Sequence, residues 1–171
     1  MPDAALDLLM TRRSIRDYTD RDVSEEDVET LLRAAMAAPS AGNEQPWHFV
    51  VIRRRETMEK IMAAHPYSDM LAQAPICIAV LAQVALERHA GYWVQDCSAA
   101  TMNLLLAAHA LGLGAVWLGV HPVADRESAL KQILSLPDGV ECLSLVAIGH
   151  PAESPAPANR FSPDRVHWEQ W

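Results

Sequence analysis

Three arginines and a serine stand within five residues near the N-terminus, in the run Arg12-Arg13-Ser14-Ile15-Arg16. Guanidinium groups bind phosphate oxygens in pairs, and a serine hydroxyl adds a short hydrogen bond. The whole chain carries a formal charge of −8, so this basic cluster contrasts with the acidic rest of the chain. The run predicts a site for one phosphate monoester. The alternative is a solvated basic turn paired with Asp17, Asp20 or Asp22.

A second candidate is the segment Ala38–Phe49, which reads APSAGNEQPWHF. Proline and glycine end the preceding helix here, and small residues let the backbone approach a flat ligand closely. The amides of Asn43 and Gln45 offer donors and acceptors for the edge of a planar heterocycle. The alternative is an ordinary loop whose amides satisfy their own backbone, with Trp47 in the core.

A third candidate is the glycine-rich segment Leu111–Gly119. Its Gly112-x-Gly114 pair follows a predicted helix and precedes a predicted strand, which is the reverse of the dinucleotide fingerprint. Gly112 is therefore interpreted as a left-handed helix C-cap. Gly119 ends an apolar strand, where the missing side chain lets a backbone N–H reach a ligand.

Other common chemistries find no support in the sequence. GxSxG, Walker and HExxH motifs are absent, and the seven histidines do not fall at metal-ligand spacing, so no metal site is predicted. Glu25–Glu26 and Glu56–Glu59 resemble solvated helix faces rather than acid–base pairs. We therefore predict no catalytic side chain.

Length and composition favour one globular domain over residues 1–171, since half of the residues are hydrophobic. The acidic net charge argues against nucleic acid and anionic membranes as partners. Cys77, Cys97 and Cys142 form no CxxC pair and are expected to be small buried side chains in a reducing compartment. The first ten residues lack the basic region of a signal peptide, which points to the cytoplasm.

Apolar periodicity predicts a mixture of helices and strands. Ser24 is expected to cap a helix that runs to Met36, with Asp27 at the third helical position and Val23 and Val28 as a hydrophobic staple. Further helices are predicted for Asp3–Met10, Gly91–Leu111 and Ala124–Leu134, and strands for Phe49–Ile52, Ile76–Leu81, Val116–Val120 (weaker) and Leu143–Ile148. The pattern predicts an α+β sandwich with a largely buried sheet.

The apolar stretch Gly91–Leu111 is long enough to raise the question of a membrane span. It contains Gln95, Asp96, Asn103 and His109, which are costly in hydrocarbon. We therefore expect a helix buried inside protein, with a subunit interface as one such place.

Taken together and in this order, these segments resemble the nitroreductase family of FMN proteins. The matching runs are RRSIR, APSAGNEQPWHFVVI, DCSAATMNLLLAAHALGLGAVWLGV, LSLVAIGHP and ANRFSPDRVHWEQW. The resemblance covers nearly the whole chain and is closest to the short, compact branch of the family. It implies a central, mostly antiparallel sheet flanked by helices, in an intertwined homodimer with FMN sites at the interface.

The C-terminal tail, residues 150–171, bears on that homodimer. It is polar and proline-rich, yet it ends with Val166, Trp168 and Trp171. Aromatic anchors on a tail usually dock on a surface. The resemblance implies that this tail wraps the neighbouring subunit, and the alternative is a tail packed on its own domain.

The resemblance also implies which residues hold FMN. The phosphate and ribityl contacts fall on the N-terminal strip and on a C-terminal cation, with Arg16 also near N1/O2 of the ring: Arg12, Arg13, Ser14, Arg16 and Arg160. A loop of the partner subunit is implied to pack on the isoalloxazine: Pro39, Ser40, Ala41, Asn43 and Gln45. The strand end whose backbone amide approaches flavin N5 matches Leu118 and Gly119. Some relatives carry a lysine where this chain has Ala158.

The implied activity is a ping-pong cycle in which NAD(P)H passes a hydride to flavin N5. An electron-poor acceptor, such as a nitroaromatic or a quinone, then takes the electrons at the same face. Three alternatives remain. The first is another flavin reaction on this fold, by a dehalogenase, a dehydrogenase or a flavin-fragmenting enzyme. The second is a non-enzymatic flavin-binding redox sensor, and the third is an α/β interaction domain without a cofactor.

Overall fold

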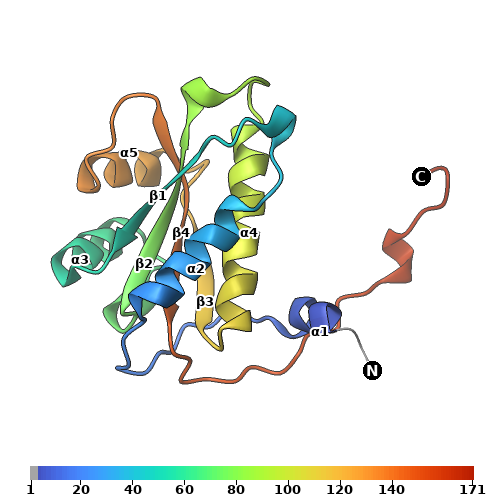
Figure 1. The fold of residues 1–171 in the computed structure, drawn as a ribbon, viewed down its shortest axis with the longest axis horizontal. Coiled ribbons are helices and arrows are strands. Elements are labelled where there is room, and N and C mark those ends of the chain that lie inside the picture. Colours follow the sequence, from blue (N-terminus) through green and yellow to red (C-terminus); the bar gives the residue numbers. More distant parts are fainter. Residues whose placement is uncertain (1–3) are drawn as a thin grey trace.

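A four-stranded antiparallel sheet forms the centre of the protein, as the computed structural model of residues 4–171 shows (Figure 1). The strands are β1 (Trp47–Ile52), β2 (Ile76–Gln83), β3 (Gly114–Gly119) and β4 (Val140–Gly149), in the order β1-β2-β4-β3. β2 and β4 are therefore internal and are buried almost throughout. Strands covered on both faces need apolar side chains in both directions, which explains their continuous apolar sequences.

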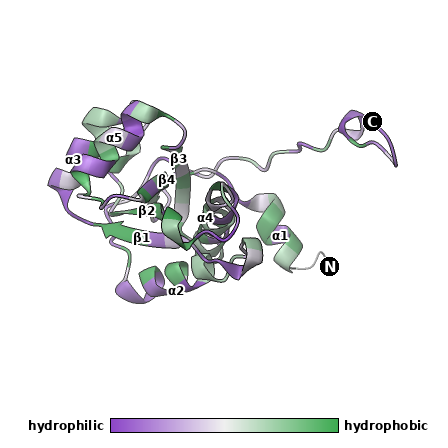
Figure 2. Cartoon of the chain, turned by 90° about the horizontal axis from the view of Figure 1, so that it is seen from above, coloured by the Kyte–Doolittle hydropathy of each residue, from purple (hydrophilic) through white to green (hydrophobic). Residues whose placement is uncertain are grey.

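Helices cover both faces of the sheet (Figures 1 and 2). On one face lie α2 (Glu25–Met36) and α4 (Trp93–Ala110); on the other lie α3 (Arg55–Ala64) and α5 (Ala124–Ile133). Alternate residues of β2 serve the two layers, so that Ile78 packs with the α2 and α4 side and Ala79 with the α3 and α5 side. The predicted α+β sandwich with an antiparallel sheet is confirmed.

The start of α2 follows the predicted capping pattern. The Ser24 hydroxyl oxygen accepts a hydrogen bond from the Asp27 backbone N–H at 3.0 Å and donates to the Asp27 carboxylate at 2.7 Å. Val23 and Val28 are both buried in the same apolar cluster, as expected of a staple. The predicted N-terminus of this helix is confirmed.

The end of α4 is also as predicted. Gly112 has φ +72°, its N–H donates to His109 O at 3.0 Å, and Leu113 N–H donates to Ala108 O at 2.8 Å. This double hydrogen bond satisfies two terminal carbonyls and requires the left-handed residue that glycine supplies.

Element bounds differ from the predictions by a few residues. β3 begins two residues before the predicted Val116, and β4 extends beyond Leu143–Ile148 at both ends. The sequence patterns gave no residue range for α3. The interpretation of Glu56–Glu59 as a solvated helix face is confirmed. Glu56 and Lys60 form an exposed i,i+4 ion pair at 2.6 Å on this helix.

α4 packs against the sheet and against α2, where the Asn103 side chain donates to Ala34 O at 3.0 Å. None of the helices within residues 4–171 has both the length and the hydropathy that a membrane crossing requires. All three cysteines are free and buried, as predicted. Burial raises the pKa of Cys97 and of Cys142 to about 12 and raises that of Cys77 as well.

Both terminal segments lie outside the sandwich. α1 (Ala4–Thr11) has no buried residue and contacts the end of α4, where the Thr11 hydroxyl lies 2.8 Å from His109 Nε2. Asp3, which was predicted to begin this helix, lies outside the described residues. The C-terminal tail projects from the body of the chain (Figures 1 and 2), and its aromatic side chains are exposed: Phe161 by 77%, Trp168 by 84% and Trp171 by 101%.

Candidate cofactor site at the open edge of the sheet

The arginine strip runs beside the open edge of β3. Ser14 forms a parallel bridge with Ala115, and the Ile15 N–H donates to Ala115 O at 3.0 Å. The buried Tyr18 hydroxyl donates to Ile15 O at 2.6 Å. Backbone pairing therefore fixes the strip in an extended conformation along the edge strand.

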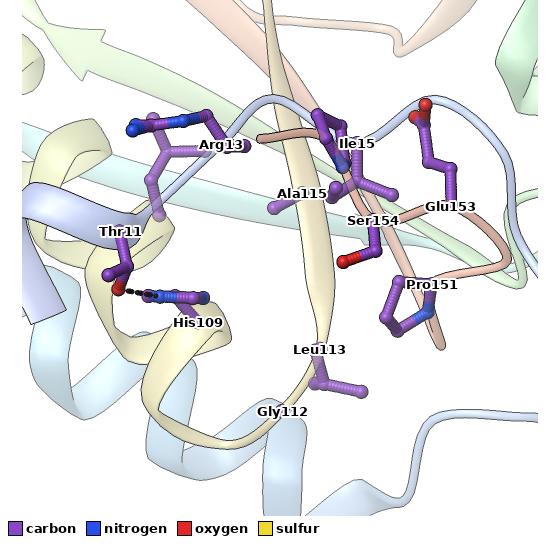
Figure 3. A pocket seen from close by; sticks show the side chains of 12 residues that line it. Thr11, Arg13, Ile15, His109, Gly112, Leu113, Ala115, Pro151, Glu153 and Ser154 are labelled. Carbon is purple, nitrogen blue, oxygen red and sulfur yellow. Dashed lines mark hydrogen bonds between the residues drawn. The ribbon is translucent and has the colours of Figure 1, made fainter. Parts of the chain in front are cut away.

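Successive side chains of an extended segment point in opposite directions. Ile15 packs on Gly114 so closely that a Cβ there would lie 2.6 Å from its Cγ2. Arg13 and Ile15 line a cavity of about 250 Å³ between the end of α4 and the segment Pro151–Pro155 (Figure 3). Arg12, Ser14 and Arg16 do not line it, which divides the strip into two sides.

The guanidinium of Arg13 is already bound to the protein. It donates to the carbonyl oxygens of Ala156 at 3.0 Å, Met10 at 2.9 Å and Arg12. These contacts join α1, the strip and the first part of the C-terminal tail. The contacts of Arg13 in the structure are therefore structural ones, and its part in binding a cofactor stays a prediction.

Arg12 differs from Arg13 in that one donor of its guanidinium group is not bound to the described part of the chain. Its Nε is buried without a hydrogen-bond partner among the described residues. Burial lowers the pKa of Arg12, and the nearby charges of Arg13 and Arg160 lower it further. The N-terminal strip and the C-terminal Arg160 therefore come together as a cation cluster in which a buried donor lacks an acceptor.

Arg16 is exposed and is positioned through its backbone. Glu153 Oε1 accepts from the Arg16 N–H at 2.5 Å and from the Asp17 N–H at 3.2 Å. Asp22, one of the carboxylates considered as a partner for the strip, instead pairs with Arg53 at 2.9 Å. Within residues 4–171 no ion pair joins the strip to Asp17, Asp20 or Asp22.

Gly119 lies at the far end of the same strand edge. Val120 N–H donates to Leu143 O of β4 at 3.1 Å, and residues alternate in an antiparallel ladder. The N–H and C=O of Gly119 therefore point away from β4, as those of Ala115 do. A Cβ at Gly119 would meet no atom within 4 Å, whereas the Leu118 side chain is buried.

The carbonyl of Gly119 is held by two donors. His65 Nε2 lies 2.9 Å from this oxygen, and Arg126 Nη1 donates to it at 2.9 Å. Gly119 is about 13 Å from Ala115 at the usual rise of a strand. The edge therefore presents the arginine strip at one end and, at the other, a peptide fixed by His65 and Arg126.

The loop Pro39–Gln45 has a strained backbone. Gly42, Asn43 and Gln45 have φ of 53°, 56° and 48°, and the last two are non-glycine residues in the left-handed region, which is typical of functional loops. The Gln45 amide donates to Asn43 Oδ1 at 2.8 Å, so these amides bond to each other rather than only to their own backbone. A hollow of about 310 Å³ lies between this loop and the start of α4.

The strip and the loop lie at opposite ends of α4 (Figure 1). Ala41 N–H donates to Asp96 in the first turn of the helix at 2.9 Å, whereas Thr11 contacts His109 in the last turn. Asp96 and His109 are thirteen residues apart, or about 20 Å along the helix. A single chain therefore holds the two predicted parts of the site well apart.

Several residues around these groups were not singled out from the sequence: Glu44, His65, Asp96, Arg126 and Glu153. Each acts on a partner more than 5 positions away in the chain, so local spacing carries no signal of it. Among residues 4–171 no three His, Cys, Asp or Glu side chains gather as metal ligands would.

The sequence model of the Nitroreductase family matches residues 9–65 and 62–150. A protein of Methanothermobacter thermautotrophicus, provisionally named as an NADH dehydrogenase/NAD(P)H nitroreductase, is 51% identical over 166 residues, which are 97% of this chain and 87% of that protein.

Solved structures show the same fold. A protein of Parabacteroides distasonis with the same provisional name is 35% identical and superposes with a TM-score of 0.96 over 99% of both chains. A provisionally named nitroreductase of Desulfovibrio desulfuricans, solved in complex with FMN, is 33% identical with a TM-score of 0.90 over 100% of this chain and 99% of that one.

Proposed function

The chain belongs to the nitroreductase family, and from this premise we propose that it binds FMN and transfers reducing equivalents from NAD(P)H to an electron-poor small molecule. The observation that carries the proposal is the buried Nε of Arg12, which has no hydrogen-bond partner within residues 4–171 and lies beside Arg13 and Arg160. This cluster stands on the same strand edge as the open Gly119 peptide. The FMN-bound relative from Desulfovibrio desulfuricans supports the choice of cofactor.

The cation cluster suits the phosphate of FMN. A buried guanidinium N–H without an acceptor is costly, and a phosphate oxygen would satisfy it with a charge-assisted hydrogen bond. Arg12 and Arg160 would hold this end of the cofactor, with the Ser14 hydroxyl beside them. Arg13 would act mainly by fixing the strip and the tail through backbone carbonyls.

The Gly119 peptide suits the edge of the flavin ring. Its N–H points out of the sheet edge, and the space that a side chain of Gly119 would take is open. His65 and Arg126 fix the Gly119 carbonyl on the same edge. A rigid donor aimed at a ring nitrogen would orient the ring without having to reorganise.

The separation of the strip from the loop supports a site shared by two subunits. In a homodimer, the strip and Gly119 of one protomer would hold the cofactor while the partner's Pro39–Gln45 loop packs on its ring. The surfaces that such a dimer needs are exposed in the protomer: the apolar side chains of α1 and the aromatic tail. Apolar surface of this extent on one chain is typical of an interface.

When bound, FMN would supply hydride chemistry between a reduced nicotinamide and the acceptor. The protein would contribute binding, ring orientation and the positive charge of Arg16 near the ring. None of these tasks requires a side chain as acid or base, which agrees with the absence of a predicted catalytic pair.

The test is the visible spectrum of the purified protein during anaerobic titration with NADH or NADPH. We expect bound FMN to bleach, and to recover its colour when a quinone or nitroaromatic is added. Arg16→Ala should weaken FMN binding and slow the bleaching, whereas Arg21→Ala, an exposed arginine in the adjoining segment, should not. A protein that fails to take up FMN, or whose bound FMN no nicotinamide reduces, would contradict the proposal.

A further inference from the structure

Two carboxylic acids, Glu44 and Asp96, are buried against each other beneath the loop Pro39–Gln45. Glu44 is 7% exposed and Asp96 is 4% exposed. Glu44 comes from the loop itself, and Asp96 from the first turn of α4. No lysine or arginine forms an ion pair with either one among residues 4–171.

Each carboxyl group has one satisfied oxygen and one unsatisfied oxygen. Glu44 Oε2 accepts from the Arg88 N–H at 2.6 Å and the His89 N–H at 3.1 Å. Asp96 Oδ1 accepts from the Ala41 N–H at 2.9 Å. The other two oxygens, Glu44 Oε1 and Asp96 Oδ2, are buried without a donor in the described part of the chain.

The two side chains lie within hydrogen-bonding reach of each other. Two ionised carboxylates in this position would repel each other, and both would keep a buried acceptor without a donor. A single proton between them removes the repulsion and satisfies both orphan oxygens at once. A carboxylic acid that donates to a carboxylate forms a short, strong hydrogen bond.

We propose that Glu44 and Asp96 share one proton, and that this proton fastens the Pro39–Gln45 loop to the first turn of α4. The pair is a positioning device for the loop. It works together with the Ala41 hydrogen bond, so that the strained turn is held to α4 at two places. Its effect on FMN rests on the proposed function, whereas the proton sharing rests on the protomer alone.

The surroundings place the proton on Asp96. Burial raises the pKa of Asp96, against the hydrogen bond from Ala41, and the charges of Glu44 and Glu87 raise it further. Burial also opposes ionisation of Glu44, but the N–H groups of Arg88 and His89, the Asp96 hydrogen bond and the His89 charge together lower its pKa.

The charged side chains next to the pair, those of Glu87 and Arg88, already hydrogen-bond to backbone groups elsewhere. Glu87 Oε1 accepts from the Trp93 N–H at 2.8 Å, and Arg88 Nη1 donates to Gly42 O at 3.2 Å. Because folding raises the pKa of Asp96 and lowers that of Glu44, the fastening is present where Asp96 is protonated and Glu44 is ionised. It is lost as the pH rises through the pKa of Asp96 in the folded protein.

Amide substitutions test the shared proton without changing side-chain shape. In Asp96→Asn the amide N–H₂ replaces the proton and donates to Glu44, and in Glu44→Gln it donates to Asp96. Each single variant should therefore keep the loop in place. The double variant turns two N–H₂ donors toward each other with no acceptor between them. Its loss of unfolding free energy should therefore be well above the sum of the losses in the two single variants.

The measurements are the infrared C=O stretch of a protonated carboxylic acid, at a pH above the range in which exposed carboxyl groups titrate, and the unfolding free energy of the full chain across pH. We expect the stretch in the wild type and in the control Glu87→Gln, and its loss in both single variants. The stability of the wild type relative to Asp96→Asn should fall as the pH rises through the pKa of Asp96 in the folded protein. Absence of the stretch in the wild type, or additive effects in the double variant, would overturn the proposal.

FMN affinity is measured separately on the same proteins. It should fall at least tenfold in the double variant and less in the single variants. If no protein binds FMN but the infrared and stability results hold, the proposed function fails while the shared proton stands. If FMN binds and is reduced but the stretch is missing, the shared proton fails while the proposed function stands.

Discussion

His65 Nε2 lies 2.9 Å from the carbonyl oxygen of Gly119 and links the end of α3 to the end of the edge strand. His65 is 1% exposed, and its Nδ1 faces the Tyr67 N–H at 3.3 Å. Because Nδ1 accepts that hydrogen bond, the proton is assigned to Nε2, which donates to Gly119. The neutral imidazole thus holds a peptide whose own N–H faces the candidate cofactor site.

His65→Ala should lower the free energy of unfolding by about 1–3 kcal/mol, because a buried hydrogen bond is lost and a cavity replaces the ring. His65→Gln can restore one donor and should lose less. Urea unfolding of the flavin-free protein measures this effect, and FMN affinity should fall in the same order. An Ala variant as stable as the wild type would show that the contact has no structural role.

Arg12 and Arg13 should respond in opposite ways to substitution by alanine. Arg12→Ala should weaken FMN binding by roughly tenfold or more, the value of one charge-assisted hydrogen bond, without destabilising the flavin-free protein. Arg13→Ala should destabilise that protein, since three backbone carbonyls lose their donor. Fluorescence titration with FMN and thermal unfolding measure the two effects. The reverse pattern would refute the division of the strip into a binding side and an architectural side.

Removal of residues 161–171 should dissociate the proposed dimer into monomers and reduce FMN binding. The aromatic side chains of this segment are exposed in the protomer and need an apolar surface to cover them. Sedimentation equilibrium gives the mass of each species. A stop at residue 161 that leaves both the dimer and the affinity intact would assign the interface to other surfaces.

The three thiols should be inert in the folded protein. Burial raises the pKa of Cys97 and Cys142 to about 12, so they stay neutral while the thiols of the unfolded chain ionise. Stability from these thiols is therefore complete below pH 9 and is lost as the pH rises toward 12, by about 1.4 kcal/mol per pH unit for each thiol. A disulfide reagent at pH 8 should react only after denaturation, and Cys97→Ala should leave turnover intact. Fast labelling of the native protein would contradict this.

Local patterns in the sequence predicted most of the fold. The Ser24 cap and the Gly112 C-cap depend on residues within a few positions of each other, and the internal strands are marked by their continuous apolar runs. The strand order β1-β2-β4-β3 and the bounds of α3 depend on contacts between distant segments. No local pattern reports those contacts.

The candidate site was predictable in part for the same reason. The arginine strip, the loop and Gly119 are each recognisable from residue type. The family resemblance assigned all three to one cofactor site. The division between Arg12 and Arg13 follows from the pairing of Ile15 with Ala115, which only the structure shows. Asp96 could be interpreted from the sequence only as a charge that argues against a membrane span, because its partner Glu44 lies 52 positions away.

The most direct test of a site shared by two subunits is complementation between two defective chains. One chain carries Arg16→Ala, and the other carries Gln45→Glu in the loop; each homodimer should bind FMN weakly. Co-expressed with different tags and purified as the mixed dimer, the two chains form one site with both changes and one site with neither. We predict wild-type FMN affinity at that second site and its bleaching by NAD(P)H. A mixed dimer that binds FMN as weakly as its parents would show that each site is built from a single chain.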